Sequence, residues 1–230
     1  MEELTRLEWL LGNDYKKLQD KTVLVLGLGG VGGYALETLV RSGIGNLILV
    51  DFDTVDITNT NRQLIATKET IGKLKTDAWE ERIHSIISSC NVTKITAKIT
   101  EENIELLFQN KPDFVIDACD TIRVKCLCIK KCLEYHIPFI SSMGTANKMD
   151  ATKLEITDIR KTSYDPIAKI IRNYVKKEHL KGKIPVVCSK EPPKKLDGKL
   201  GTMMPVPAVC GILLGQYTIE KLLKEICYES

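Results

Sequence analysis

The sequence predicts an α/β fold, in which a mostly parallel β-sheet is covered by helices on both faces. Short apolar runs alternate along the chain with longer segments of helical periodicity, and no internal repeat interrupts this order. The first apolar run ends at Leu26 and passes directly into the glycine-rich segment 27–33, which opens a helical pattern. Successive βα units of this size form a parallel sheet with right-handed crossovers.

The individual elements follow from the apolar runs and the helical patterns. Strands are expected at residues 23–26, 47–50, 92–97, 114–116, 139–141 and 153–156. Helices are expected at residues 31–41, 74–88, 101–109, 121–134 and 165–177, with a final apolar helix at 206–226. A ligand of such a sheet lies beyond the carboxyl ends of its strands. Gly27, Asp51, Asp117 and Asp120 fall at these ends.

Length and composition are those of an ordinary soluble globular protein. The chain has 230 residues, of which 43% are hydrophobic and 27% are charged, and its formal net charge is +3. It has no uninterrupted run of about 18 apolar residues, as a membrane span would need. The start, Met1-Glu2-Glu3, lacks the basic residues and apolar core of a secretory signal. We therefore expect a cytoplasmic protein with no membrane partner.

The glycine-rich segment is typical of a nucleotide-binding turn. Glycines permit a tight turn, and the N-terminus of the following helix adds partial positive charge where an anion would sit. The next strand ends in Asp51, whose carboxylate can bind ribose hydroxyls. Dehydrogenases that use NAD also combine a glycine turn with an acid about 20 residues downstream. These two features alone leave both classes of nucleotide-binding protein open.

The residues after Asp51 distinguish the two classes. Asn59, Arg62 and Lys75 follow the acid and could surround a triphosphate. A dinucleotide site seldom needs so many polar groups beyond its ribose acid. Arg offers phosphate oxygens a planar fork of donors, and Lys offers them a point charge. The sequence therefore favours ATP over NAD.

In these motifs the chain resembles the ThiF-type, or ubiquitin-activating-enzyme-like, superfamily of ATP-dependent carboxylate-adenylating enzymes. The resemblance rests on the glycine turn, segment 51–63, Lys75 after Gly72, and segment 117–120. It implies a Rossmann-like sheet and ATP with Mg²⁺ as ligands. The implied nucleotide-binding residues are Gly29, Gly30, Gly32, Asp51, Asp53, Asn59, Arg62 and Lys75.

The resemblance also implies the catalytic groups. Arg62 and Lys75 would stabilise charge on the phosphate chain, and Asp120 would hold Mg²⁺ or orient the reacting groups. Arg6, in an Arg-x-x-x-Leu-Leu-Gly opening, matches an arginine that in relatives reaches the phosphates of the neighbouring subunit. A role for Arg6 therefore implies a homodimer.

Within the superfamily, the chain is most similar to the tRNA threonylcarbamoyladenosine dehydratases. The shared features are segments 6–12, 41–45, 58–63 and 158–162, and Asp165-Pro166. These enzymes adenylate the carboxylate of a modified adenosine in tRNA and close it into a ring, which implies tRNA as the partner. Two alternatives remain open. One is an adenylyltransferase for the C-terminal carboxylate of a small ubiquitin-like sulfur carrier, with a sulfur-transfer or cysteine-desulfurase partner. The other is a nucleotide-binding module without turnover.

We expect a single adenylating domain over residues 1–230. It would consist of an N-terminal helical segment (1–21), a nucleotide-binding core (22–145) and a C-terminal part (146–230). The last part contains a Lys- and Arg-rich stretch, 172–199, that Pro and Gly interrupt. This basic loop is either a solvated, mobile segment or a surface for tRNA phosphates. The net charge of +3 is too small to decide between these readings.

The eight cysteines predict no zinc site, because no Cys-x-x-Cys pair is present. Several relatives carry zinc on two such pairs. The cysteines expected to be buried and apolar are Cys119, Cys126, Cys128 and Cys132. Cys188 stands apart, because it lies beside polar residues in an expected loop and near Lys183 and Lys190. It is the candidate if the chemistry needs a reactive thiol.

Overall fold

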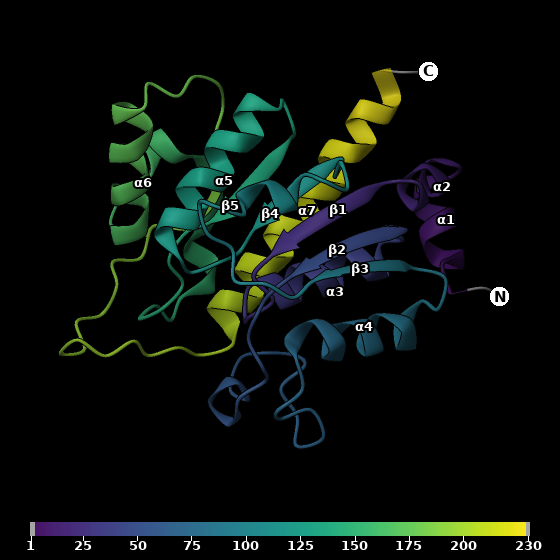
Figure 1. The fold of residues 1–230 in the computed structure, drawn as a ribbon, viewed down its shortest axis with the longest axis horizontal. Coiled ribbons are helices and arrows are strands. Elements are labelled where there is room, and N and C mark those ends of the chain that lie inside the picture. The colour runs from purple at the N-terminus through teal and green to yellow at the C-terminus, as the bar shows by residue number, and fades with distance from the viewer. Residues whose placement is uncertain (1–2, 229–230) are drawn as a thin grey trace.

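A single seven-stranded sheet organises the chain (Figure 1). The computed structural model describes residues 3–228. The strands are β1 (Thr22–Leu26), β2 (Asn46–Val50), β3 (Asn91–Ile95), β4 (Phe114–Asp117), β5 (Phe139–Ser142), β6 (Leu154–Asp158) and β7 (Pro185–Ser189). Their order is β3-β2-β1-β4-β5-β7-β6. Neighbouring strands from β3 to β7 are parallel, and β6 runs antiparallel to β7 at the edge.

Helices cover both faces of the sheet, as the sequence predicts. They are α1 (Thr5–Leu11), α2 (Asp14–Gln19), α3 (Gly32–Arg41), α4 (Lys75–Ile86), α5 (Ile122–Glu134), α6 (Pro166–Lys177) and α7 (Pro205–Tyr228). Helices α3, α4 and α7 pack on one face, and α5 and α6 pack on the other (Figure 1). The predicted α/β fold with a final C-terminal helix is therefore confirmed.

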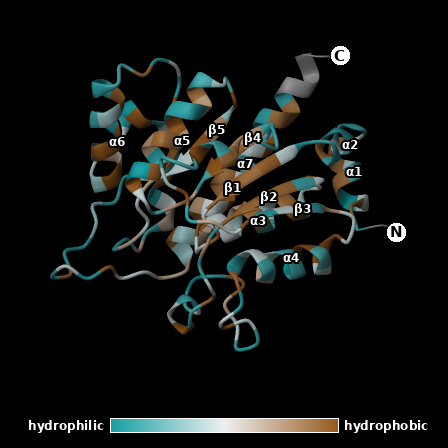
Figure 2. Cartoon of the chain, in the orientation of Figure 1, coloured by the Kyte–Doolittle hydropathy of each residue, from teal (hydrophilic) through white to brown (hydrophobic). Residues whose placement is uncertain are grey.

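Alternate residues of each strand build two hydrophobic cores. In β1, Val23 and Val25 join the core beneath α3, α4 and α7, whereas Leu24 and Leu26 join the core beneath α5 and α6. A parallel sheet covered on both faces therefore has apolar residues at successive strand positions. Figure 2 shows the result, with hydrophobic strands and a hydrophobic α7 surrounded by hydrophilic loops.

Helix α7 packs closely against α3. A Cβ on Gly211 would lie 2.2 Å from the carbonyl oxygen of Val31, and a Cβ on Gly215 would lie 2.8 Å from the Cβ of Thr38. The glycines thus let the two helices approach. By length and composition, Pro205–Lys224 could also cross a membrane, with a mean hydropathy of 1.2, but 50% of that stretch is buried inside the fold. Packing in the core accounts for its apolar character.

The prediction of a helix at residues 101–109 is wrong. Only a 3₁₀ turn, Ile104–Leu107, forms there. Asn103 provides the physical reason, because its side-chain oxygen accepts a hydrogen bond from the Thr100 N–H at 2.7 Å and its amide donates to the Lys98 carbonyl at 3.0 Å. Such local side-chain bonds compete with a regular helix.

The prediction of a basic loop over residues 172–199 is also wrong in part. Residues 172–177 belong to α6, and Pro185–Ser189 form β7, a buried strand between β5 and β6. The apolar run in β7 is short and flanked by lysines and prolines, so its strand character depends on pairing with residues distant in sequence. The remaining irregular segment, residues 190–204, is called the strap below.

Candidate active site

The glycine turn joins β1 to α3. Two of its positions leave no room for a side chain. Gly27 has a φ of +86°, and a Cβ there would lie 2.8 Å from the Cys119 backbone. A Cβ on Gly32 would lie 1.8 Å from the Gly27 carbonyl oxygen. The turn leads into the N-terminus of α3, where backbone N–H groups and the helix dipole favour an anion.

Gly29 and Gly30 lie beside the segment that carries the predicted phosphate-binding residues. The nearest neighbour of a Cβ on Gly29 would be Gln63 Nε2 at 3.7 Å, and that of a Cβ on Gly30 would be Arg62 Cγ at 3.2 Å. The side-chain oxygen of Gln63 is buried with no hydrogen-bond partner among residues 3–228. Buried acceptors are normally paired, so this oxygen suits a donor group on a bound ligand or an ordered water.

Asp51 is fixed by the glycine turn and by its own loop. Its carboxylate accepts hydrogen bonds from the backbone N–H of Leu28 at 2.7 Å and of Asp53 at 2.9 Å. Lys75 begins α4 and is 6% exposed; its Nζ lies 2.8 Å from Asp53 Oδ2 and 3.9 Å from Asp51 Oδ2. The structure therefore brings the predicted ribose acid and the predicted phosphate lysine into one cluster.

Segment 57–63 folds around a tight turn after β2. The Asn59 side-chain oxygen accepts the Asp56 N–H at 3.2 Å, while the Asp56 carboxylate accepts the Thr58 N–H at 2.8 Å. This capping arrangement is the turn role that Asn side chains commonly take. Arg62 Nη1 donates to the Thr58 carbonyl at 2.8 Å and to Asn61 Oδ1 at 2.9 Å, which holds its guanidinium over the same turn.

Asp120 follows β4 and is exposed. Its carboxylate accepts one long hydrogen bond of 3.4 Å from the Thr121 hydroxyl. Asp117, three residues earlier, is fully buried and paired with Lys125, whose Nζ lies 3.0 Å from its Oδ2. Burial alone would lower the pKa of Lys125, but the Asp117 carboxylate raises it above its ordinary value, so Lys125 stays charged. Of the two acids, Asp120 is the one accessible to a metal ion.

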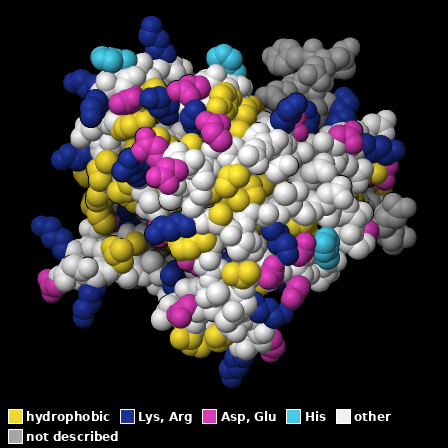
Figure 3. Space-filling model, viewed as in Figure 1, with side chains coloured by type: hydrophobic (Ala, Val, Ile, Leu, Met, Phe, Trp, Pro, Cys, Tyr) yellow, Lys and Arg dark blue, Asp and Glu magenta, His cyan; other side chains and the backbone are white. Residues whose placement is uncertain are grey.

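The strap crosses the carboxyl end of the sheet and is tied to it by two asparagines. Asn147, after β5, donates its N–H to Gly201 O at 2.7 Å and accepts the Gly201 N–H at 2.6 Å. Asn61 Nδ2 donates to the Thr202 carbonyl at 3.0 Å, next to Arg62. The strap therefore adjoins the nucleotide-binding segment, and Figure 3 shows Lys and Arg side chains projecting from this edge of the molecule.

Arg6 lies far from these residues within the same chain. It is an exposed residue of α1, which packs near Gly43 at the amino end of β2 (Figure 1). The other predicted residues gather at the carboxyl ends of the strands. Arg6 therefore cannot complete the site of its own subunit.

Cys188 is not in a loop, which corrects the expectation from the sequence. It lies in β7, is 2% exposed, and its side chain belongs to the core beneath α5 and α6. Burial raises its thiol pKa to about 11, and the nearby Asp165 carboxylate acts in the same direction. Cys126, Cys128 and Cys132 are buried as expected, whereas Cys119 is only half-buried. In residues 3–228, no group of three or more His, Cys, Asp or Glu side chains could hold a metal ion.

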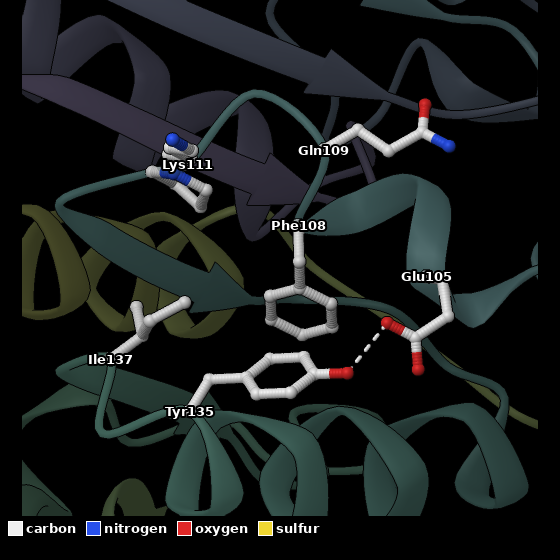
Figure 4. Close-up of a pocket in the computed structure, with 7 residues that line it drawn as sticks. Glu105, Phe108, Gln109, Lys111, Tyr135 and Ile137 are labelled. Carbon is white, nitrogen blue, oxygen red and sulfur yellow. Dashed lines mark hydrogen bonds between the residues drawn. The ribbon is translucent and has the colours of Figure 1, made fainter.

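A pocket of about 440 Å³ lies at the other end of the sheet (Figure 4). It is lined by Glu105, Phe108, Gln109, Lys111, Pro112, Tyr135 and Ile137. The Phe108 and Tyr135 rings pack edge to face at 5.2 Å, and the Tyr135 hydroxyl donates to Glu105 at 2.7 Å. These residues precede β4 and β5, so the pocket is separate from the candidate site at the carboxyl ends.

The fold and the arrangement of the site define the class of protein. Residues 4–229 match the ThiF family, and the chain belongs to it. The predicted resemblance to this superfamily is therefore confirmed.

Individual relatives show which members of the family the chain is similar to. The chain is 42% identical over 245 residues to a tRNA threonylcarbamoyladenosine dehydratase of Bacillus subtilis, an alignment that covers 98% of this chain and 96% of the relative. The crystal structure of the Escherichia coli tRNA N6-threonylcarbamoyladenosine dehydratase TcdA in complex with ATP has a TM-score of 0.93 at 30% identity, with coverage of 99% and 96%. The AMP complex of the same enzyme has a TM-score of 0.91 at 31% identity, with coverage of 96% and 94%.

Sequence reasoning missed the buried groups around the site. Asp117 was visible at the end of a strand, but nothing in the sequence indicated that Lys125 and Ser141 contact it. Lys125 stands in the helical pattern at 121–134, where a lysine is usually solvated. Its position one helical turn after Thr121, on the same face as buried Cys128 and Ile129, is the signal that could have revealed it.

Proposed function

We propose that this chain uses ATP to adenylate the carboxylate of threonylcarbamoyladenosine in tRNA and then closes the activated group into a ring. The observation that carries the proposal is the similarity to tRNA threonylcarbamoyladenosine dehydratases over almost the whole chain. The gathering of Asp51, Arg62, Lys75 and Asp120 at the carboxyl ends of β2 and β4 supports it.

In the first step, an oxygen of the substrate carboxylate attacks the α-phosphorus of ATP and pyrophosphate leaves. Negative charge grows on the phosphate oxygens, where Arg62 and Lys75 would stabilise it. Mg²⁺, held by Asp120, would supply further positive charge at the same oxygens. The carboxylate is already ionised, so this step needs no general base.

In the second step, a nucleophilic atom of the same modified nucleoside attacks the activated carbonyl carbon, and AMP leaves. The nucleoside thereby loses one water overall, whose elements are accounted for by hydrolysis of ATP to AMP and pyrophosphate. An intramolecular attack depends above all on orientation. The residues around the site would contribute by holding the nucleoside and excluding bulk water.

We further propose a homodimer in which Arg6 contributes to the partner's site, and a tRNA-binding role for the strap. Because α1 lies at the opposite end of the sheet, Arg6 would act at the phosphates of a second subunit in a homodimer. The exposed strap residues Lys194, Lys195 and Lys199 would contact tRNA phosphates beside the nucleotide site. We also propose a cytoplasmic location.

The sulfur-carrier alternative is less well supported. A mechanism through a thioester or persulfide needs an accessible thiol of low pKa. Cys188 was the candidate, and it is buried with a raised pKa. The relatives described above also carry the name of the tRNA enzyme rather than that of a carrier-activating enzyme.

Nucleotide binding and turnover test the proposal together. Calorimetry should give binding of ATP with Mg²⁺ and no binding of NAD; tighter binding of NAD would remove the adenylation mechanism. Asp120→Ala should abolish AMP formation with a much smaller loss of ATP affinity, because the carboxylate would act mainly in the reaction. Equal turnover by Asp120→Ala would assign Asp120 a structural role.

A further inference from the structure

A buried ion pair lies beneath the turn that carries Asp120. Asp117 ends β4, Lys125 lies in α5, and both side chains are 1% exposed. Neither group can contact a bound nucleotide from this position. Burying two charges is unfavourable unless each is closely paired and hydrogen-bonded, and removing one partner is strongly destabilising. The contacts that the Asp117 carboxylate makes therefore indicate what this buried pair contributes to the structure.

The Asp117 carboxylate has donors on both oxygens. Oδ2 accepts the Ser141 hydroxyl of β5 at 2.6 Å and Lys125 Nζ at 3.0 Å. Oδ1 accepts the backbone N–H of Cys119 at 3.3 Å and its thiol at 3.1 Å. One buried carboxylate thus connects β4, β5, α5 and the turn 118–121. Among these contacts, that to the Cys119 N–H acts on the turn backbone directly.

The same turn is held from its other side by the glycine turn. Ala118 donates its N–H to the Leu26 carbonyl at 2.8 Å, and the missing side chain of Gly27 lets the two backbones touch. The turn 118–121 is therefore fixed between the end of β1 and the Asp117 carboxylate. The Asp120 side chain itself has only the long contact to Thr121 among the interactions found in residues 3–228. The backbone of the turn, not side-chain contacts, sets the position of Asp120.

We propose that Asp117, Lys125 and Ser141 are positioning residues that hold the turn so that the Asp120 carboxylate stands at a fixed place beside the glycine turn. The inference rests on the proposed function, which makes Asp120 the acid of the adenylation step. Lys125 neutralises Asp117, so that no unpaired negative charge lies beneath a site for ATP. Ser141 completes the carboxylate's hydrogen bonds and fixes its rotamer.

Ser141→Ala tests the proposal without burying an unpaired charge. It removes one hydrogen bond to Asp117 and leaves the ion pair intact. We expect the rate of pyrophosphate release with ATP, Mg²⁺ and threonylcarbamoyladenosine-modified tRNA to fall roughly tenfold, as loss of one charge-assisted hydrogen bond can produce, with unchanged ATP affinity. Ser142→Ala is the matched control, because Ser142 is the next residue of β5 and points to the opposite face. It should keep the wild-type rate.

A double-mutant cycle separates positioning from general support of the fold. Asp120→Glu serves as the second variant, because it keeps a carboxylate but displaces it and so should lower the rate without abolishing it. If Ser141 acts through the position of Asp120, Ser141→Ala should have no further effect on the reduced rate of Asp120→Glu. The same fold-loss in both backgrounds, or an unchanged rate for Ser141→Ala alone, would overturn the proposal. Failure of the proposed function gives a different result, namely no pyrophosphate release by the unsubstituted chain with this tRNA.

The role of the ion pair can be tested by replacing both charged side chains with uncharged side chains of similar shape. Lys125→Met alone would remove the cationic partner of the buried Asp117 and is expected to destabilise the fold strongly. Asp117→Asn combined with Lys125→Met removes both charges together. This double variant should melt cooperatively and bind ATP with wild-type affinity, but release pyrophosphate more slowly. A wild-type rate in a folded double variant would contradict the role of the pair.

Discussion

Cys188 shows how a single residue changes the choice between mechanisms. It lies in a strand whose residues are all buried, and burial raises its thiol pKa to about 11. A raised thiol pKa leaves the group protonated and unreactive at neutral pH. The thiolate becomes the major form only above that pKa.

We therefore expect slow alkylation of Cys188 in the native chain. A pKa about two units above that of an exposed thiol lowers the thiolate fraction roughly a hundredfold at pH 8. Peptide mapping after iodoacetamide treatment should show little label at Cys188 at that pH, a steep rise toward pH 11, and full label in urea at any alkaline pH. Rapid labelling of the native chain at pH 7 would contradict this. Cys188→Ser should also retain dehydration of the tRNA nucleoside.

Candidate-site residues that belong to a local motif could be predicted from the sequence, whereas contacts between distant segments could not. Gly27, Asp51 and Lys75 could be predicted because each stands at a fixed place in a strand–turn–helix pattern. The contact of Ser141 with Asp117 could not be predicted, because it depends on β5 lying beside β4. The cluster of Lys75 with Asp53 is also a product of the folded loop rather than of any one motif.

The strap is the segment on which tRNA recognition would depend. It is held by Asn61 and Asn147, while its lysines project into solvent. Phosphate contacts by such side chains release counterions, so binding weakens as salt increases. Lys190 is paired with Glu155 at 2.6 Å and is therefore a less suitable contact than the lysines farther along the strap.

Reversing two strap charges should weaken tRNA binding. We expect Lys195→Glu with Lys199→Glu to raise the Kd for tRNA at low salt roughly tenfold or more, and to reduce the slope of log Kd against log salt by about two. Filter binding over a salt series measures both values. The matched control reverses Lys16 and Lys17 on α2, at the opposite end of the sheet. Equal losses in the two double variants would indicate a general charge effect and exclude the strap as the contact.

The elements themselves were largely predictable, for a physical reason. Strands such as β1 and β2 are apolar on both faces because helices cover both, so they stand out as continuous runs. The exceptions are elements that local sequence does not determine. The strand β7 is stabilised by pairing with β5 and β6, and the expected helix near residue 105 is replaced by a turn that Asn103 stabilises.

The role proposed for Arg6 would need a second subunit, because α1 lies at the opposite end of the sheet from the candidate site. Helix α1 exposes Trp9 and Leu10, at 72% and 79%, an apolar surface suited to burial in a dimer. Arg6→Ala and Asp120→Ala should each be inactive alone. Mixed in denaturant and refolded, they should recover part of the activity, because one site of each heterodimer would then be intact. Sedimentation as a monomer at micromolar concentration, or no recovery on mixing, would contradict this arrangement.

The activity that we propose for this chain is the dehydration of threonylcarbamoyladenosine in tRNA at the expense of ATP. The most direct measurement incubates the protein with ATP, Mg²⁺ and tRNA bearing that nucleoside, and then analyses the digested nucleosides by mass spectrometry under mild conditions. We expect a product lighter by one water, formed together with AMP and pyrophosphate and absent without ATP. An unchanged nucleoside, in a preparation that forms AMP with a small sulfur-carrier protein instead, would contradict it.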